Sequence, residues 1–174
     1  MTIRKAQKSD IAAVLTLWEA AKTFMKAQGL PQWQQGYPAL PEAEADIAAD
    51  RLWLIEEDGV PLAVFVFDTA PDPSYETLAE GGWRIPGAYG ALHRSAVAAE
   101  ARGKGVGGMA AAHCRSLCAQ RGLPALRVDT HPDNRPMRTM LERAGFAHCG
   151  LIYLADGLEQ GSPRVTYEMR VAED

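Results

Sequence analysis

Apolar positions in the first third of the chain change from helical spacing to nearly continuous runs. Ser9-Asp10 precedes apolar side chains three and four residues apart, which predicts a helix that ends at Gly29-Leu30-Pro31. Pro41, followed by acidic residues, predicts the start of a second, short helix. Two apolar segments then flank Asp58-Gly59, a dipeptide typical of tight hairpins, so we expect paired strands at 51–57 and 60–68.

The rest of the chain alternates strands with helices. The pattern predicts a first strand over 2–6, later strands over 88–97, 126–129, 146–154 and 164–171, and helices over 105–120 and 134–144. We expect Gly122 at the position that follows a helix end, and a hairpin across Asp156-Gly157. Residues 69–87 are rich in Gly and Pro and form a long excursion, which in a compact domain is usually functional or disordered.

This order of elements predicts an α/β (α+β) fold. One β-α-β crossover lies among strands that are otherwise neighbours in sequence, so we expect a mixed, mostly antiparallel sheet of about seven strands with helices on both faces. A length of 174 residues predicts a single domain over 1–174.

Composition narrows the class of protein. Hydrophobic residues make up 47% and the net charge is −4, so we expect a globular protein with no nucleic-acid partner. The apolar runs are too short to cross a bilayer and no apolar segment follows the basic N-terminus, so we expect no membrane partner and a cytoplasmic location. Three cysteines without C-x-x-C spacing predict buried, reduced thiols and no metal site. Among protein partners, the sequence is compatible with a homodimer. Arg115, Arg121 and Arg127 are expected to be solvated surface charges, one of which could meet the adenosine phosphate of a bound nucleotide.

The most informative segment is a glycine cluster between a predicted strand and a predicted helix. Gly103, Gly105 and Gly108, with Arg102 and Lys104, would bring main-chain N–H groups and positive charge to a phosphate or diphosphate. The segment lacks the Ser or Thr that a Walker loop needs after its lysine. The same glycines satisfy the dinucleotide pattern G-x-G-x-x-G, with an acid, Asp129, about 20 residues on, but too little chain follows for a doubly wound domain.

Arg102-Gly103-Lys104-Gly105-Val106-Gly107 matches the Q/R-x-x-G-x-G/A signature of the GNAT superfamily of N-acetyltransferases, and the chain resembles that family over nearly its whole length. The resemblance implies acetyl-CoA as co-substrate, with the diphosphate held by main-chain N–H groups from Arg102 to Gly107. It also implies that the strand around Ala96 and Val97 pairs with the pantetheine arm and points an N–H at the thioester carbonyl. Asn134 would contact the pantetheine or cap its helix.

The catalytic groups remain open at this stage. Many family members carry a tyrosine in the last helix, in the pattern N-x-x-A-x-x-x-Y, that protonates the leaving thiolate; here Met137 and Leu141 stand at the alanine and tyrosine positions. Either the thiolate leaves unaided or Tyr153 or His131 serves as the acid. His93 is the first candidate for the base because it shares strand parity with Val97 and imidazole titrates near working pH. The alternatives are two acidic residues in the long loops, Asp72 and Glu76.

The resemblance predicts an enzyme that moves an acetyl group to a primary amine by direct attack in a ternary complex. The acceptor would be a small-molecule or peptide amine. Aromatic side chains that could cover an amine, or simply pack beneath a loop, are Trp33, Tyr37, Tyr75 and Trp83. The alternatives are a non-catalytic acyl-CoA-binding module on the same fold and, outside the family, a nucleotide-dependent oxidoreductase.

Overall fold

The computed structural model describes residues 1–171 and contains two compact units, each built from two segments of the chain. The first unit comprises Met1–Phe67 and His93–Ala110. The second comprises Asp68–Leu92 and the described residues from Ala111 onward. The single domain expected over 1–174 stays a prediction.

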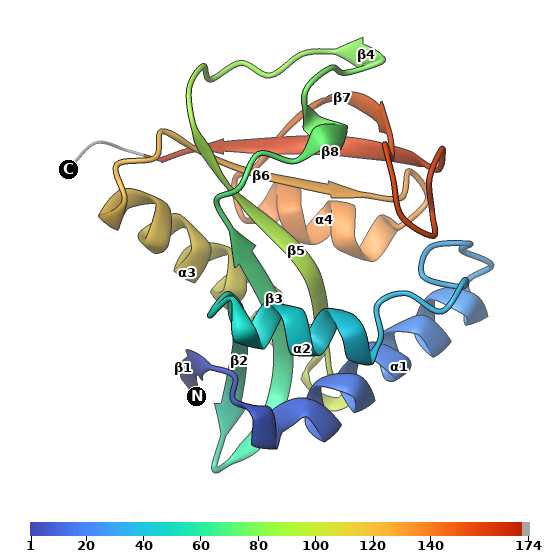
Figure 1. The fold of residues 1–174 in the computed structure, drawn as a ribbon, viewed down its shortest axis with the longest axis vertical. Coiled ribbons are helices and arrows are strands. Elements are labelled where there is room, and N and C mark those ends of the chain that lie inside the picture. Colours follow the sequence, from blue (N-terminus) through green and yellow to red (C-terminus); the bar gives the residue numbers. More distant parts are fainter. Residues whose placement is uncertain (172–174) are drawn as a thin grey trace. The chain divides into compact units, whose positions relative to one another are not determined.

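The first unit carries one long and one short α-helix beside an antiparallel arrangement of strands. Its elements are β1 (Thr2–Lys5), the 3-10 helix η1 (Lys8–Asp10), α1 (Ile11–Ala27), α2 (Leu40–Ala48), β2 (Leu52–Glu57), β3 (Val60–Asp68), the second half of β5 (Tyr89–Val97), the 3-10 helix η3 (Ala99–Ala101) and the start of α3 (Val106–Gln120). The strand order is β1-β2-β3-β5, and the β1–β2 and β2–β3 ladders are antiparallel. Helices α1 and α2 lie side by side (Figure 1). Asp58 and Gly59 both have positive φ, which confirms the tight hairpin between β2 and β3.

The second unit continues from the first half of β5. Its other elements are the 3-10 helix η2 (Pro73–Tyr75), β4 (Glu80–Gly81), the remainder of α3, β6 (Ala125–Thr130), α4 (Arg135–Arg143), β7 (Ala147–Tyr153) and β8 (Pro163–Arg170). The strand order is β5-β6-β8-β7-β4, with β5–β6 parallel and the other ladders antiparallel. Four α-helices and eight strands of mixed direction within residues 1–171 confirm the predicted fold class.

Opposite faces of β8 have different covers. The Tyr167 hydroxyl accepts a hydrogen bond from Arg138 Nε of α4 at 3.0 Å, so this helix lies against one face. Glu168 points to the other face, where its carboxylate accepts hydrogen bonds from the main-chain N–H groups of Arg84 and Ile85. The long excursion is therefore an ordered cover on the second unit's strands.

Three details differ from the sequence predictions. The excursion contains β4, a two-residue strand that is too short to leave an alternating pattern. The strands β7 and β8 pair as expected, but residues 154–162 connect them, so the turn is longer than Asp156-Gly157 alone. Arg127 is buried, not solvated, because it packs beneath the excursion.

Candidate active site

Strand β5 contains a strained residue at the start of its second half. Arg94 has φ of +46°, in the left-handed region that side chains other than glycine rarely adopt. Its carbonyl oxygen accepts a hydrogen bond from Trp18 Nε1 of α1 at 3.1 Å, which holds this peptide in place. Backbone strain of this kind costs about 1–3 kcal/mol and is found most often at functional sites. The strain at Arg94 therefore favours this part of β5 as the location of the site.

The side chain of Arg94 is fixed by a buried carboxylate. Its Nε and Nη2 donate to the two oxygens of Asp46 at 2.8 and 2.9 Å, and Asp46 is completely buried on α2. Arg51 also donates to Asp46, from Nε at 2.7 Å. The remaining donor of Arg94, Nη1, reaches the Tyr37 hydroxyl at 2.7 Å. Burial alone would lower the pKa of Arg94, but Tyr37 and Asp46 raise it above its usual value, so the guanidinium is charged at every working pH.

Beyond Arg94, β5 continues outside its ladder with β6. That parallel ladder spans Tyr89–Ala91 and Ala125–Arg127 only. The predicted pantetheine-binding residues Ala96 and Val97 therefore lie on a stretch of β5 whose main chain takes no part in it. A strand edge of this kind is what an extended ligand needs in order to pair with main-chain groups.

The glycine-rich turn follows directly and leads into α3. Gly103 and Gly105 have φ of +75° and +82°, a conformation that requires glycine there. A Cβ added at Gly103, Gly105 or Gly108 would meet no atom within 4 Å, so these residues border open space. Because α3 begins at Val106, the N–H groups of its first turn have no partner within the helix. Positive-φ glycines beside a helix N-terminus fit a diphosphate held by main-chain amides.

The two cations of the turn have different surroundings. The Arg102 guanidinium lies 3.9 Å from the ring centroid of Phe24 and its Nε donates to the Val97 carbonyl at 3.4 Å. Arg102 thus ties the end of β5 to α1. Lys104 is exposed and can meet an anion from solvent.

The remaining first-unit candidates are His93, Trp33 and Tyr37. His93 is half-buried in β5. The left-handed φ of Arg94 interrupts the alternation between His93 and Val97, so the parity argument no longer supports a base at His93, which stays a prediction. Trp33 is buried, and Tyr37 contacts Arg94 as described.

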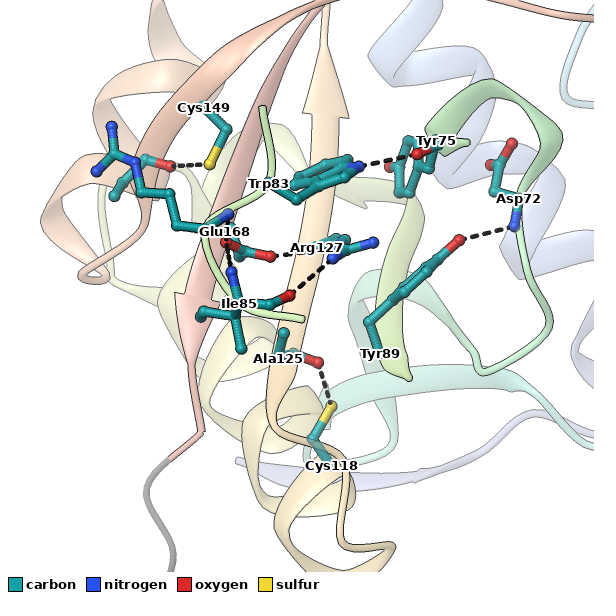
Figure 2. Close-up of polar contacts among 12 residues, drawn as sticks. Asp72, Tyr75, Trp83, Ile85, Tyr89, Cys118, Ala125, Arg127, Cys149 and Glu168 are labelled. Carbon is teal, nitrogen blue, oxygen red and sulfur yellow. Dashed lines mark hydrogen bonds and ion pairs between the residues drawn. The ribbon is translucent and has the colours of Figure 1, made fainter. Parts of the chain in front are cut away.

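Tyr75 and Trp83 belong to the excursion; Trp83 packs against Arg127, and Tyr75 packs against Trp83 (Figure 2). Tyr75 is buried, its hydroxyl donates to Asp129 at 2.7 Å and its carbonyl accepts from Trp83 Nε1 at 2.8 Å. The Arg127 guanidinium lies 4.2 Å from the ring centroids of both Trp83 and Tyr89. The rings of Trp83 and Tyr89 therefore already contact a cation of the protein itself, Arg127. A role for Tyr75 and Trp83 in binding the acceptor amine stays a prediction.

The second unit also carries the candidates near the last helix. Asn134 caps α4 by accepting from the Met137 N–H at 3.2 Å, as the sequence indicated. Burial lowers the pKa of His131, Arg164 lowers it further, and Asp133 and Glu159 oppose the shift. His131 is thus mostly neutral at pH 7, and its Nδ1 accepts from the Asp133 N–H. Tyr153 is 54% exposed at the end of β7.

The sequence analysis missed two residues near the candidate site, Asp46 and Arg94. In the sequence, Asp46 is one of several acidic residues on a short helix, and its position in the pattern does not indicate that it is buried. Arg94 did carry a signal, since it is the one charged residue of the strand Tyr89–Val97.

The match to known families agrees with this geometry. A sequence profile described as the acetyltransferase (GNAT) family matches residues 14–146. The chain belongs to the GNAT acetyltransferase family. This GNAT protein is accordingly an acyltransferase of the N-acetyltransferase class.

The individual relatives of this GNAT chain share about a quarter of its residues. The "Uncharacterized N-acetyltransferase YhfO" of Bacillus subtilis (strain 168) is 27% identical over 147 residues, which span 84% of this chain and 89% of that one. A GNAT family acetyltransferase structure from Streptococcus agalactiae 2603 shares 26% identity with a TM-score of 0.85, covering 99% of this chain and 96% of that one. A putative acetyltransferase structure from Staphylococcus aureus Mu50 has the same fold, at 24% identity and a TM-score of 0.73, covering 99% of this chain and all of the other.

Two further findings concern the GNAT chain's described residues. Among residues 1–171, none of the helices combines the length and hydropathy of a bilayer-spanning segment. The same residues contain no group of three or more His, Cys, Asp or Glu side chains placed to hold a metal ion. Cys114, Cys118 and Cys149 are buried free thiols, as predicted.

Proposed function

We propose that this protein transfers an acetyl group from acetyl-CoA to the primary amine of a small-molecule or peptide acceptor, by direct attack of the amine in a ternary complex. The observation that carries the proposal is the turn at Gly103 and Gly105. It combines left-handed glycines, open space and the first N–H groups of α3, which suits the diphosphate of CoA. The family generally uses acetyl-CoA, which agrees with this choice of donor.

The thioester of acetyl-CoA supplies the activated acetyl carbon, and the chain's own groups would position and polarise it. A main-chain N–H group from the stretch around Ala96 and Val97 can donate to an oxygen on which negative charge develops. The acceptor amine must lose a proton before it attacks, and His93 is the predicted base. Much of the rate can come from holding the amine against the carbonyl.

The last helix provides no proton donor at the family's tyrosine position. Leu141 occupies it and is completely buried. The sequence left Tyr153 and His131 as alternatives. The lowered pKa of His131 depletes the imidazolium form that could protonate a thiolate at neutral pH, which favours Tyr153 of the two.

The direct test measures release of the CoA thiol. The purified protein is incubated with acetyl-CoA and each member of a panel of polyamines, amino acids, aminoglycosides and peptides with free N-termini. We expect amine-dependent thiol release and an acetylated product of matching mass. The three buried cysteines should add little background to a thiol reagent, and a reaction without amine measures that background directly.

The absence of an acid at Leu141 keeps one second function in view, a non-catalytic acyl-CoA-binding module. Micromolar CoA binding without turnover on any amine would favour that module. Tight NAD binding without CoA binding would favour the oxidoreductase, which family membership leaves without support.

A further inference from the structure

Asp46 binds the strained residue of the strand that leads to the proposed CoA site. We propose that Asp46 is a positioning residue for acetyl transfer, which acts through Arg94 to keep the main chain of β5 in its left-handed conformation. This inference rests on the proposed function, in which Ala96 and Val97 pair with the pantetheine arm. It uses contacts within the first unit only.

Arg94 is held at two points. On the main chain, its carbonyl oxygen accepts a hydrogen bond from Trp18 Nε1 of α1 at 3.1 Å. On the side chain, Nε and Nη2 donate to the two carboxylate oxygens of Asp46 on α2 at 2.8 and 2.9 Å. Trp18 and Asp46 are both completely buried. Two helices thus fix both the peptide and the side chain of the strained residue.

The ion pair between Asp46 and Arg94 is better explained by conformation than by stability. A buried pair often adds little net stability, because both charges lose their hydration, but it can select one arrangement of the groups that carry the charges. Arg94 requires such selection, because a residue with a side chain rarely adopts a left-handed backbone unless its surroundings impose it. The bidentate contact from α2 supplies that constraint.

The conformation at Arg94 sets the course of the last residues of β5. Beyond the ladder with β6, the Ala98 N–H donates to the Leu62 carbonyl of β3 at 2.8 Å, so this end of the strand keeps a neighbour on one side. Ala96 and Val97 follow Arg94 by two and three positions. In the proposed function this stretch aims an N–H group at the thioester carbonyl, and a misplacement of about 1 Å can lower a rate by about 10²-fold.

The test compares Asp46→Asn with a matched Asp10→Asn variant, since asparagine keeps the shape of aspartate and removes its charge. Asp10 also accepts two hydrogen bonds from one arginine, Arg4 of β1, at 2.8 and 2.9 Å, but it belongs to η1. With kcat expressed per folded molecule, we expect Asp46→Asn to lower it by about 10-fold or more, because the left-handed backbone is no longer imposed. Asp10→Asn should keep kcat within about twofold.

Substitution of Arg94 by glycine separates the effect on the backbone from a loss of stability. Glycine adopts the left-handed region without the steric cost that other residues bear, so it does not need the ion pair. In the Asp46→Asn background, Arg94→Gly should therefore give a kcat per folded molecule about 10-fold higher than Arg94→Ala. Both double variants lack the same charges, so a role in stability alone would leave these kcat values equal. Should Asp46→Asn fail to fold, the two Arg94 substitutions are compared in the wild-type background.

Ligand affinity locates the effect on the strand. The nucleotide diphosphate part of CoA, without its pantetheine arm, should bind Asp46→Asn and the wild type equally in titration calorimetry, because it uses the turn at Gly103 and Gly105. Whole CoA should bind Asp46→Asn several-fold more weakly, because its pantetheine arm pairs with the altered strand.

Three results would overturn the assignment. They are a kcat in Asp46→Asn within about twofold of that in Asp10→Asn, equal kcat values in the glycine and alanine variants, and equal losses of affinity for CoA and for its nucleotide part. A wild type that releases no CoA thiol with any amine would refute the proposed function itself. An active wild type with any of the three results refutes this inference alone.

Discussion

Replacing Arg127 by Met should remove contacts that hold the excursion, residues 69–87, against the strands of the second unit. Arg127 Nε donates to Glu168 at 3.1 Å, and Nη2 donates to the Ile85 carbonyl at 3.1 Å. The guanidinium also lies between the rings of Trp83 and Tyr89 (Figure 2). Met fills a similar length of apolar side chain but provides neither the charge nor the donors.

The expected loss follows from the burial of the ion pair. The side chains of Arg127 and Glu168 are 7% and 2% exposed, so the variant leaves a carboxylate in the interior without its counter-charge. Removing one partner of a buried pair costs about 3–5 kcal/mol. For a protein of this size that corresponds to a fall in Tm of roughly 6–20 °C. The two main-chain N–H donors that Glu168 keeps favour the lower end of that range.

The assay is urea unfolding followed by tryptophan fluorescence, with thermal unfolding as a second measurement. Arg121→Met is the matched control because Arg121 is exposed on the protein surface, and its unfolding free energy should stay within about 0.5 kcal/mol of the wild type. Glu168→Gln combined with Arg127→Met should cost less than the sum of the single variants, by about 1 kcal/mol or more. An Arg127→Met variant as stable as Arg121→Met would refute the argument that this buried pair holds the excursion.

Three further changes test the site and its surroundings. Gly105→Glu should weaken CoA binding by about 100-fold or more, because the new carboxylate would face a diphosphate. The control Gly59→Glu, at a nearly equal φ in the β2–β3 hairpin, should keep the CoA affinity of the wild type. Equal CoA affinities in the two variants would show that the turn is not part of the CoA site. His93→Ala should lower kcat at neutral pH and alter its pH profile without changing CoA affinity, and an unaltered profile would exclude His93 as the base. Burial lowers the pKa of His131 below its ordinary 6.5, so the unfolding free energy should fall as the pH drops from 6.5 through the native pKa. In denaturant titrations, the unfolding free energy of His131→Gln should depend less steeply on pH. An equal dependence in the variant and the wild type would contradict the lowered pKa.

Local signals in the sequence predicted the elements well. The Asp58-Gly59 turn, the glycine that follows α3 and the boundaries of α3 and α4 were all accessible, because hairpins and helix ends depend on a few neighbouring residues. The glycine turn before α3 was accessible for the same reason, since its φ values require glycine. These positions indicate a family before any long-range contact is known.

Long-range burial was not accessible. Arg127 and Glu168 alternate with apolar residues in their strands, a pattern typical of one solvated face, and only the excursion reveals that this face is covered. Asp46 and Arg94 are 48 residues apart, and no local pattern relates them. The left-handed φ of Arg94 likewise depends on contacts with α1 and α2, so the interruption of strand alternation between His93 and Val97 could not be predicted from the sequence.

In the proposed function, the turn at residues 102–107 binds the diphosphate of a thioester carrier through main-chain N–H groups. A crystal structure of the protein with CoA tests it most directly. The diphosphate oxygens should accept hydrogen bonds from N–H groups within that turn and the first residues of α3. Well-defined density for the diphosphate at any other place on the protein would contradict the account.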